Sequence, residues 1–285
     1  MRAYLSAAFI VAITVALSAP AVHAQGAADR AKVLRTVADA LGMGRYSDIG
    51  GANTRLPGID IVNTMELQGS GTSDMGGRPV KTDFHIALGY NPVAARVELT
   101  RTPDGGAAQH TIQTVRDTYA WNESEIGAGL VQGKGVATPA MMAVRERLLR
   151  IWMLPYGVVK AAYAAGDKTV VGTEAGATTI NAPLSGPLAG ITLKATLDAN
   201  SLITKVEARA ENTALATLNS EAEYSGYADH AEVLTDVKTP GRMVLKQGGR
   251  TVADMTVKTW ETNNPYLVFP VPANVKAAPA TTTSR

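Results

Sequence analysis

One helical stretch in a long series of strand-like segments constrains the fold most. Residues 139–166, PAMMAVRERLLRIWMLPYGVVKAAYAAG, carry the longest helical pattern, and segments with strand patterns flank them on both sides. Glu146, Arg147 and Arg150 share one face at about 100° per residue. The broad opposite face is apolar and consists of Met141, Val144, Leu148, Leu149, Ile151 and Trp152. The pattern predicts an amphipathic helix that rests on an apolar surface.

Prolines and glycines set the expected limits of this helix. Thr138 is a suitable N-cap, and Pro139 suits the first helical position because no amide hydrogen is needed there. Pro155 should interrupt the helix. We expect a second, more buried helix over residues 156–165 that ends at Gly166.

Arg145 breaks the apolar pattern, because it projects between Trp152 and Leu149. Two interpretations are open. The side chain reaches the rim of the apolar surface or pairs with a carboxylate, or it is a polar anchor inside an otherwise apolar cavity.

Strand patterns dominate the rest of the chain, including residues 59–67, 215–224 and 232–238. Strong turn signals, such as residues 103–106 and 247–249, separate neighbouring segments. Strands on both sides of a single helical insertion favour antiparallel meanders over βαβ units. The predicted fold class is α+β: one strongly curved antiparallel sheet, an incomplete barrel of about eleven strands, with helices packed in or over its concave face.

The N-terminal residues resemble an export signal. Arg2 precedes an apolar run, and Ala21 to Ala24 has the small-x-small form that signal peptidase cuts. We expect cleavage after Ala24, one domain over residues 25–276 that begins with a helix at 29–41, and a disordered tail at 277–285. The predicted location is the periplasm, with secretion as the alternative.

Composition excludes several classes of function. The chain has no cysteine, which excludes disulfides, thiolate metal sites and the lipid-modified cysteine of a lipoprotein. It has 27 Lys and Arg residues against 25 Asp and Glu residues, so the strongly basic patch of a nucleic-acid-binding protein is not expected. No segment after the leader is long and apolar enough to span a membrane.

Residues for catalysis or metal binding are sparse. Only His85, His110 and His230 follow the predicted leader, and no two of them have metal-ligand spacing. No GxSxG nucleophile motif occurs. Asp83 and His85 share a strand face, so an enzyme that uses this pair is one open hypothesis, and a surface cross-link is the other. We expect no cofactor, no metal and no enzymatic activity.

Aromatic side chains gather near the helical stretch in the sequence. Trp121, Trp152, Tyr156 and Tyr163 are either ordinary core residues or the lining of a pocket for an apolar ligand. Methionines in and beside the helix suit an irregular apolar partner.

Two resemblances to known families add to this pattern. The layout of leader, short helix, meander, helical insertion and second meander resembles the LolA/LolB-like periplasmic lipoprotein carriers. RVELTR (96–101) and TVRDTYAWNE (114–123) are similar to that family's strand and D-G-x-x-x-W stretch, with Trp121 in the tryptophan place and Thr118 instead of glycine. The resemblance implies an incomplete barrel with a helical lid, and a ligand-binding lining formed by Trp121, Met141, Val144, Leu148, Leu149 and Trp152. Arg145, from the helix pattern, and Tyr156, from the aromatic cluster, complete the predicted ligand-binding residues.

Residues 145–168 and 239–263 also resemble regions of exported bacterial proteins that in some cases precede a metallo-β-lactamase-fold domain. The HxHxDH motif of that hydrolase is missing here, so the resemblance implies an accessory region. Two functions follow as expectations. The first is a non-enzymatic periplasmic protein that binds a lipid or the acyl chain of a lipoprotein. The second is an interaction module for an exported metallo-hydrolase or envelope complex.

Overall fold

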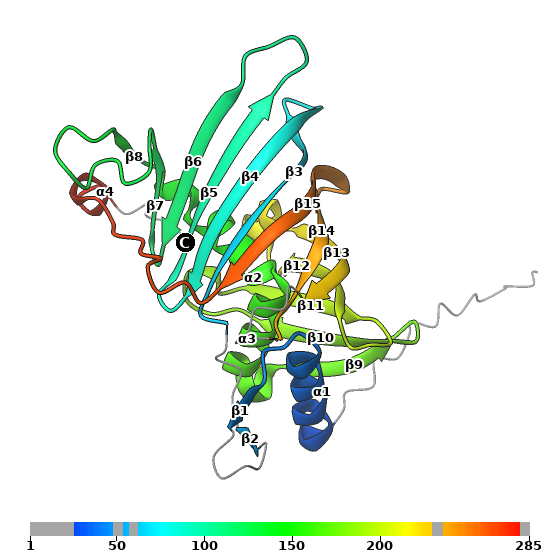
Figure 1. The fold of residues 1–285 in the computed structure, drawn as a ribbon. Helices are drawn as coiled ribbons and strands as arrows, with labels where there is room; N and C mark the ends of the chain where they lie inside the picture. The colour runs from blue at the N-terminus through cyan, green and yellow to red at the C-terminus, as the bar shows by residue number, and fades with distance from the viewer. Residues whose placement is uncertain (1–25, 48–53, 57–61, 230–235, 280–285) are drawn as a thin grey trace, which may run out of the picture.

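One open antiparallel sheet forms most of the computed structural model, which describes residues 26–47, 54–56, 62–229 and 236–279 (Figure 1). Its thirteen strands pair in the order β8-β7-β6-β5-β4-β3-β15-β14-β13-β12-β11-β10-β9. The first meander consists of β3 (Thr64–Met75), β4 (Arg78–Tyr90), β5 (Val93–Thr102), β6 (Gln109–Arg116), β7 (Tyr119–Glu123) and β8 (Ala137–Pro139). The second consists of β9 (Val170–Glu174), β10 (Ala177–Pro183), β11 (Ile191–Leu197), β12 (Ile203–Ala210), β13 (Ser220–Asp229), β14 (Lys238–Gln247) and β15 (Arg250–Thr262).

The two meanders meet where β3 pairs with β15, which leaves β8 and β9 as the edges of the sheet. Glycines on β3 permit this close approach. A Cβ atom added at Gly69 would lie 2.0 Å from the carbonyl oxygen of Thr256, and one added at Gly71 would lie 2.0 Å from that of Asp254. Only glycine fits a position with backbone so near.

The antiparallel α+β class is confirmed, but the expected number of about eleven strands is wrong. β8 was not expected, because it has three residues, includes Pro139 and pairs only with β7. Proline is tolerated there because an edge strand has unpaired positions. A separate two-stranded sheet contains β1 (Arg45–Ser47) and β2 (Thr54–Leu56).

Some predicted segments have other structures or lie outside the described residues. The predicted strand at 215–224 begins as a 3-10 helix, η5 (Thr213–Leu218), which Asn212 caps through its side chain. The strand predicted at 59–67 starts at Thr64, and its first three residues are not described. Most of the strand predicted at 232–238, the leader at 1–24 and residues 280–285 also lie outside the described part.

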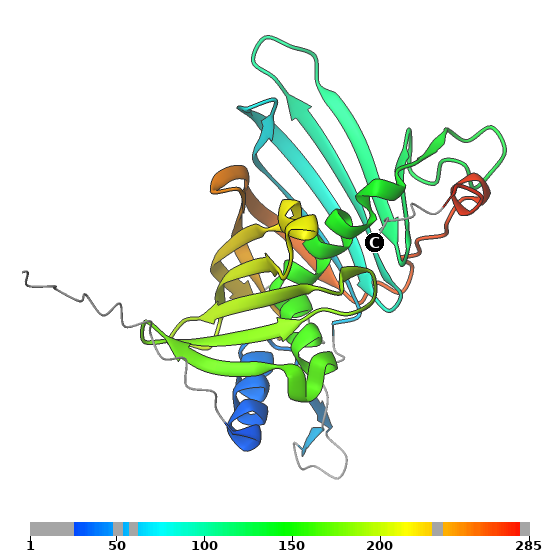
Figure 2. The ribbon, with the colours of Figure 1, turned by 180° about the vertical axis from the view of Figure 1, so that it is seen from behind.

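The helical stretch connects the two edges of the sheet. α2 (Val144–Met153), preceded by η2 (Met141–Ala143), and α3 (Pro155–Ala165) lie in sequence between β8 and β9. The chain therefore crosses the concave face of the curved sheet to reach the far edge (Figure 2). Pro155 separates the helices, and Gly166 ends the second, as predicted. The expected cap at Thr138 and helix start at Pro139 are wrong, because both residues belong to β8.

The remaining helices lie at the periphery of the molecule. α1 (Ala27–Ala40) matches the predicted N-terminal helix, and it packs against α3 and β9. α4 (Ala273–Lys276) is at the C-terminal end of the predicted domain and lies beside β7 and β8. η3 (Gly166–Lys168) and η4 (Gly186–Leu188) are single turns that follow α3 and β10.

α3 fills the concave face of the second meander with a solid core. The side chains of β9–β12 that point inward are fully buried beneath Val158, Val159 and Ala162 of α3. They are Val171, Ile180, Ala182, Leu193, Ala195, Val206 and Ala208. Since these side chains leave no exposed apolar surface, any ligand-sized space has to lie elsewhere on the concave face.

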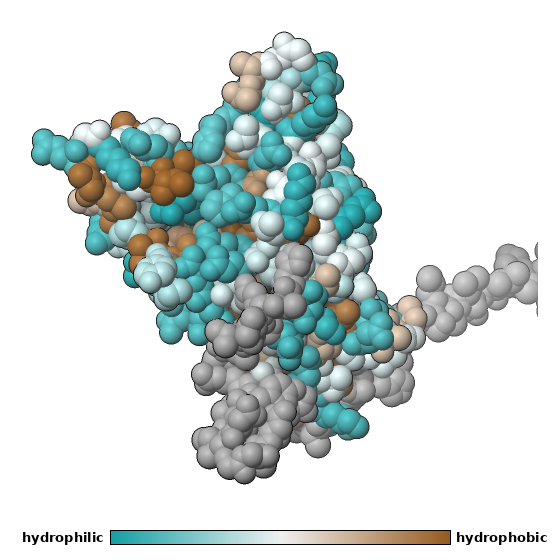
Figure 3. Space-filling view, in the orientation of Figure 1, coloured by the Kyte–Doolittle hydropathy of each residue, from teal (hydrophilic) through white to brown (hydrophobic). Residues whose placement is uncertain are grey.

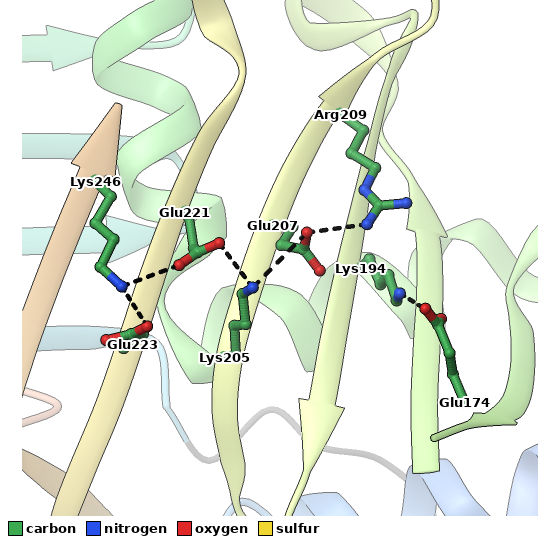
Figure 4. A network of polar contacts seen from close by, with 8 residues as sticks. All are labelled: Glu174, Lys194, Lys205, Glu207, Arg209, Glu221, Glu223 and Lys246. Carbon is green, nitrogen blue, oxygen red and sulfur yellow. Dashed lines mark hydrogen bonds and ion pairs between the residues drawn. The ribbon is translucent and has the colours of Figure 1, made fainter. Parts of the chain in front are cut away.

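The outer face of the second meander is instead charged (Figure 4). Lys205 Nζ lies 2.7 Å from Glu221 Oε2, and Lys246 Nζ lies 2.5 Å from Glu223 Oε1 and 3.3 Å from Glu221 Oε1. Burial opposes the charge of Glu221, but the hydrogen bonds from both lysines outweigh it and lower the pKa of this carboxyl. The network continues from Lys205 through Glu207 to Arg209, and Lys194 forms a separate ion pair with Glu174 beside it. Opposite charges on neighbouring strands favour this strand register.

Candidate functional site

An unfilled apolar groove lies between α2 and the concave face of the first meander. Its volume is about 370 Å³, and β3–β6, β13–β15 and the C-terminal half of α2 form its walls. The apolar lining side chains include Phe84, Ile86, Leu88, Ala95, Val97, Leu99, Val115, Ile151, Met153, Leu154, Tyr224, Met243, Leu245 and Met255. We call this space the main groove.

The walls of the main groove follow from alternation along its strands. Ala95, Val97 and Leu99 of β5 pair with Leu88, Ile86 and Phe84 of β4, and paired side chains of an antiparallel sheet share a face. Ile86, Val97, Met243, Leu245 and Ala253 are only half-buried, although they point to the concave face. This half of the sheet thus presents an apolar surface that the protein's own helices do not cover.

Three arginines line the same groove. Arg101 is the next inward position on β5 after Leu99. It therefore places a positive charge at the end of the apolar wall. Its Nε donates to Ser73 Oγ at 3.0 Å, and its Nη1 lies 3.5 Å from Thr111 Oγ1.

Arg147 and Arg150 come from α2. Arg147 Nη1 donates to the backbone oxygens of Thr114 at 3.0 Å and Trp121 at 2.6 Å, and its Nη2 donates to Asn122 Oδ1 at 2.6 Å. Arg150 pairs with Glu146 one turn earlier, with Nη2 2.5 Å from Oε1. The strands therefore fix the position of Arg147, while Arg150 is held only by its own helix.

The pKa values of Arg101 and Arg147 are both affected by Arg150. Burial lowers the pKa of Arg147 to about 10, with a further decrease from Arg150. Burial also lowers the pKa of Arg101, again with a contribution from Arg150. An anion beside any of these guanidinium groups would stabilise its positive charge.

A second space, which we call the lateral hollow, lies on the other side of α2. It has a volume of about 530 Å³, and the loop at 183–188, α3 and the β6–β7 turn complete its wall. Leu148, Trp152 and Lys168 line it. Its walls contain fewer large apolar side chains than those of the main groove, and several lining residues belong to exposed turns.

The structure divides the predicted binding residues between several places. Leu148 and Trp152 line the lateral hollow. Val144 and Leu149 are buried in the core, and Met141 packs at its edge. Tyr156 is fully buried, with its hydroxyl 2.6 Å from the Lys238 oxygen and 2.9 Å from Thr239 Oγ1. None of these six lines the main groove, where α2 contributes the residues on its other side.

Trp121 does not join the helix face, because it lies on the outer face of the sheet. It packs with Ala137 and Val275, and its Nε1 donates to Glu123 Oε1 at 2.9 Å. Its neighbour Ala120 points inward to the core instead. Trp121 therefore anchors the C-terminal segment on the outside of the first meander and cannot line the concave face.

Arg145 lines neither space, but it contacts the loop beside the lateral hollow. Its Nη2 donates to the backbone oxygen of Ala189 at 3.1 Å, and its Nε is buried without a hydrogen-bond partner. The guanidinium thus holds the loop after η4 against α2. Of the expected roles, pairing with a carboxylate does not match this contact, whereas a side chain that reaches the rim of the apolar surface is compatible with it.

Sequence reasoning missed Arg101, Arg147 and Arg150, which are the cationic residues of the main groove. The helical pattern placed Arg147 and Arg150 on a solvent face. A signal was present for Arg101, because Ala95, Val97, Leu99 and Arg101 alternate along one strand face. That alternation placed a cation at the end of an apolar stripe.

His85 has partners other than the Asp83 suggested by the sequence. Its Nδ1 lies 3.1 Å from Glu98 Oε1, and its Nε2 lies 3.2 Å from Glu66 Oε1, on the outer face of three neighbouring strands. Among the described residues, no group of three or more His, Asp or Glu side chains has a geometry that could hold a metal ion. This cluster joins β3, β4 and β5 across the sheet.

Comparisons with known proteins identify a similar structure but no family. No protein-family model matches the chain, and no curated protein matches it. A solved structure of a DUF1329 family protein from Desulfovibrio piger ATCC 29098 is similar over 84% of this chain and 93% of that chain, with a TM-score of 0.44 and 6% sequence identity. Within the described residues, no helix has both the length and the apolar character of a membrane span. The function is therefore inferred from the side chains of the chain itself.

Proposed function

We propose that the protein is a non-enzymatic binding protein that holds an apolar molecule, such as a lipid or a lipoprotein acyl chain, in the main groove. The observation that carries this proposal is the incomplete filling of the concave face. α3 seals one half of the sheet, whereas the other half retains about 370 Å³ lined by apolar side chains. Ligand pockets in proteins typically measure about 300–1,000 Å³ and are predominantly apolar.

The resemblance to LolA/LolB-like carriers supports the same function. In that family an incomplete barrel binds acyl chains beneath a helical lid. Here α2 has the position of such a lid, since it crosses the concave face between the two sheet edges. Export to the periplasm by the predicted leader is part of the proposal.

A groove-filling variant tests the proposal. Val97→Trp places a large ring in the half-buried wall of the main groove, and Thr100→Trp places the same ring on the outer face of the same strand. We expect Val97→Trp to weaken displacement of a fluorescent fatty acid by about tenfold, or ~1.4 kcal/mol. Thr100→Trp should leave it unchanged. Equal binding by both variants, or no saturable binding by the parent chain and no co-purified lipid in native mass spectrometry, contradicts the proposal.

A second candidate function, a protein-interaction module, is favoured by exposed apolar side chains at the β8 end of the sheet. The β7–β8 loop exposes Ile126, Val131 and Val136, and brown residues cover this region near α4 in Figure 3. An exported metallo-hydrolase or an envelope protein is the partner class implied by the second resemblance. Pull-down from an envelope extract with the parent chain and a Val131→Glu/Val136→Glu variant separates the candidates. A stoichiometric partner lost in the variant supports this function, and an equal set of captured proteins rejects it.

A further inference from the structure

We propose that the main groove selects apolar molecules that carry one anionic group, a carboxylate or a phosphate, and that Arg101 and Arg150 receive this group. The inference rests on the proposed function, because it names the chemical class of the ligand of the same groove. It adds a polarity to the site: an apolar tail in the interior and a negatively charged head at the arginines.

The order of side chains along β5 gives the groove this polarity. Inward positions run from Ala95 through Val97 and Leu99 to Arg101. The six residue steps from the first to the last of these positions span about 20 Å at ~3.3 Å per residue. Polar side chains accompany Arg101 at its end, where Ser73 of β3 is its hydrogen-bond partner. A long apolar chain with a terminal head group has the matching pattern.

The positive charge of Arg101 is only partly compensated, and so is that of Arg147, which lies nearer the other end of the β5 stripe. Both donate to neutral oxygens, namely hydroxyls, backbone carbonyls and an amide. No ion pair joins either of them to a carboxylate in the described part of the chain. The one acidic residue that lines the main groove, Asp74, accepts from Arg250 and from the amide of Gly77.

Arg150 is the adjustable member of the cluster. Its carboxylate partner, Glu146, lies on the exposed side of α2 and is half-exposed, as is Arg150 itself. An exposed ion pair of this kind contributes little to stability, about 0.2–1 kcal/mol. The guanidinium can therefore exchange Glu146 for an anionic ligand at small cost. Arginine also suits both head groups, because its planar fork binds carboxylate and phosphate in a bidentate manner.

The test compares three ligands with the same tail: dodecanoate, dodecyl phosphate and dodecanol. Each one displaces a neutral fluorescent lipid probe from the full-length, delipidated protein below its aggregation concentration. We expect both anions to bind at least about tenfold more tightly than the alcohol, because a hydrogen bond to a charged group contributes more than one to a neutral group. Comparison of the two anions then shows whether a carboxylate or a phosphate is preferred.

Variants locate the preference on the arginines. Arg101→Gln and Arg150→Gln should each reduce the preference for the anions several-fold while binding of the alcohol stays the same. Glu146→Gln should increase that preference, because it removes the competing carboxylate. Arg209→Gln is the matched control, since it removes an equal charge from the outer face of β12 (Figure 4). Thermal unfolding of each variant checks that the fold is intact.

The possible outcomes separate this inference from the proposed function. If all three ligands bind equally, or if Arg101→Gln and Arg150→Gln behave like Arg209→Gln, the selection of an anion is wrong and apolar binding remains. If none of the ligands displaces the probe and the probe itself does not bind, both are wrong. A preference for the anions that disappears in the arginine variants and increases in Glu146→Gln supports the inference.

Discussion

At the residue scale, Arg147 connects the main groove to the edge of the sheet. Its guanidinium bridges the backbone oxygens of Thr114 and Trp121, which lie directly opposite each other on β6 and β7. It also lines the groove. One side chain thus stabilises the short edge strands and places a positive charge at the site.

This double role leads to a prediction about stability. Arg147→Met keeps the apolar stem but removes all three hydrogen bonds, so we expect the free energy of unfolding to fall by about 2 kcal/mol. Arg150→Met, three residues along the same helix, removes only a half-exposed ion pair and should change it by less than about 1 kcal/mol. Urea unfolding followed by circular dichroism measures both. Equal changes in the free energy of unfolding for the two variants would show that the hydrogen bonds of Arg147 to β6 and β7 do not stabilise the fold.

Trp121 shows what residue patterns can and cannot predict. Alternation along β7 does predict that Ala120 and Trp121 face opposite sides of the sheet. It does not say which side is concave, because a strand pattern with apolar residues on both faces has no unique direction. The packing of Val275 and Val271 against Trp121 shows that this side chain lies on the outer face. Both valines lie about 150 positions later in the sequence.

At the element scale, the bend between α2 and α3 determines how the concave face is divided. Leu154 is extended, with φ −60° and ψ 149°, and Pro155 begins α3. The bend directs α3 onto β10 and β12, while α2 remains over β5 and β6. The proline made this break predictable from sequence. The direction of the bend was not predictable, because it depends on packing between elements far apart in the chain.

Gly157 makes the bend possible, and we therefore expect its replacement by alanine to lower the stability of the protein. Glycine to alanine within a helix normally stabilises by up to about 1 kcal/mol. A Cβ atom at Gly157, however, would lie 2.5 Å from the Ile151 oxygen and 2.8 Å from Trp152 Cα. We therefore expect Gly157→Ala to destabilise the protein by about 2 kcal/mol.

The control for this prediction is Gly26→Ala at the N-cap of α1. That glycine has φ −62°, and an added Cβ atom would meet no atom within 4 Å. We expect its thermal midpoint to stay within about 1 °C of the parent, while that of Gly157→Ala falls by several degrees. An unchanged or higher midpoint for Gly157→Ala would mean that the helices can separate without cost.

At the scale of the whole molecule, the order of the strands explains the position of the helices. Two meanders joined at β3 and β15 place β8 and β9 at opposite edges, and the segment between these strands has to cross the open side. The sequence predicted the antiparallel class and the helical insertion, because both follow from local periodicity. It did not predict the groove, because core and groove are lined by the same residue types and differ only in what packs above them.

Buried tyrosines beneath the helices make the whole fold sensitive to base. Burial raises the pKa values of Tyr90, Tyr156, Tyr224 and Tyr227 above the ordinary value of about 10. The phenol stays neutral in the folded protein, while the unfolded chain releases its proton near pH 10. Stability is therefore complete below about pH 10 and decreases as the pH rises toward the folded-state values.

The contribution of a single tyrosine can be isolated with Tyr90→Phe, because the hydroxyl of Tyr90 bonds only to backbone groups, the Ile151 oxygen at 3.5 Å and the backbone of Gly157. We expect the variant to match the parent at pH 8 within about 1 kcal/mol. Above pH 10 the parent should lose stability faster, by up to about 1.4 kcal/mol per pH unit for this one group. Urea midpoints at a series of pH values measure the difference, and tyrosinate absorbance should appear together with unfolding.

The lysine ion pairs of the outer face also weaken in base, but they are common to both proteins and cancel in the comparison. Parallel stability curves for the two proteins above pH 10 would show that base reaches Tyr90 without unfolding, and hence that the core around α2 and α3 opens locally.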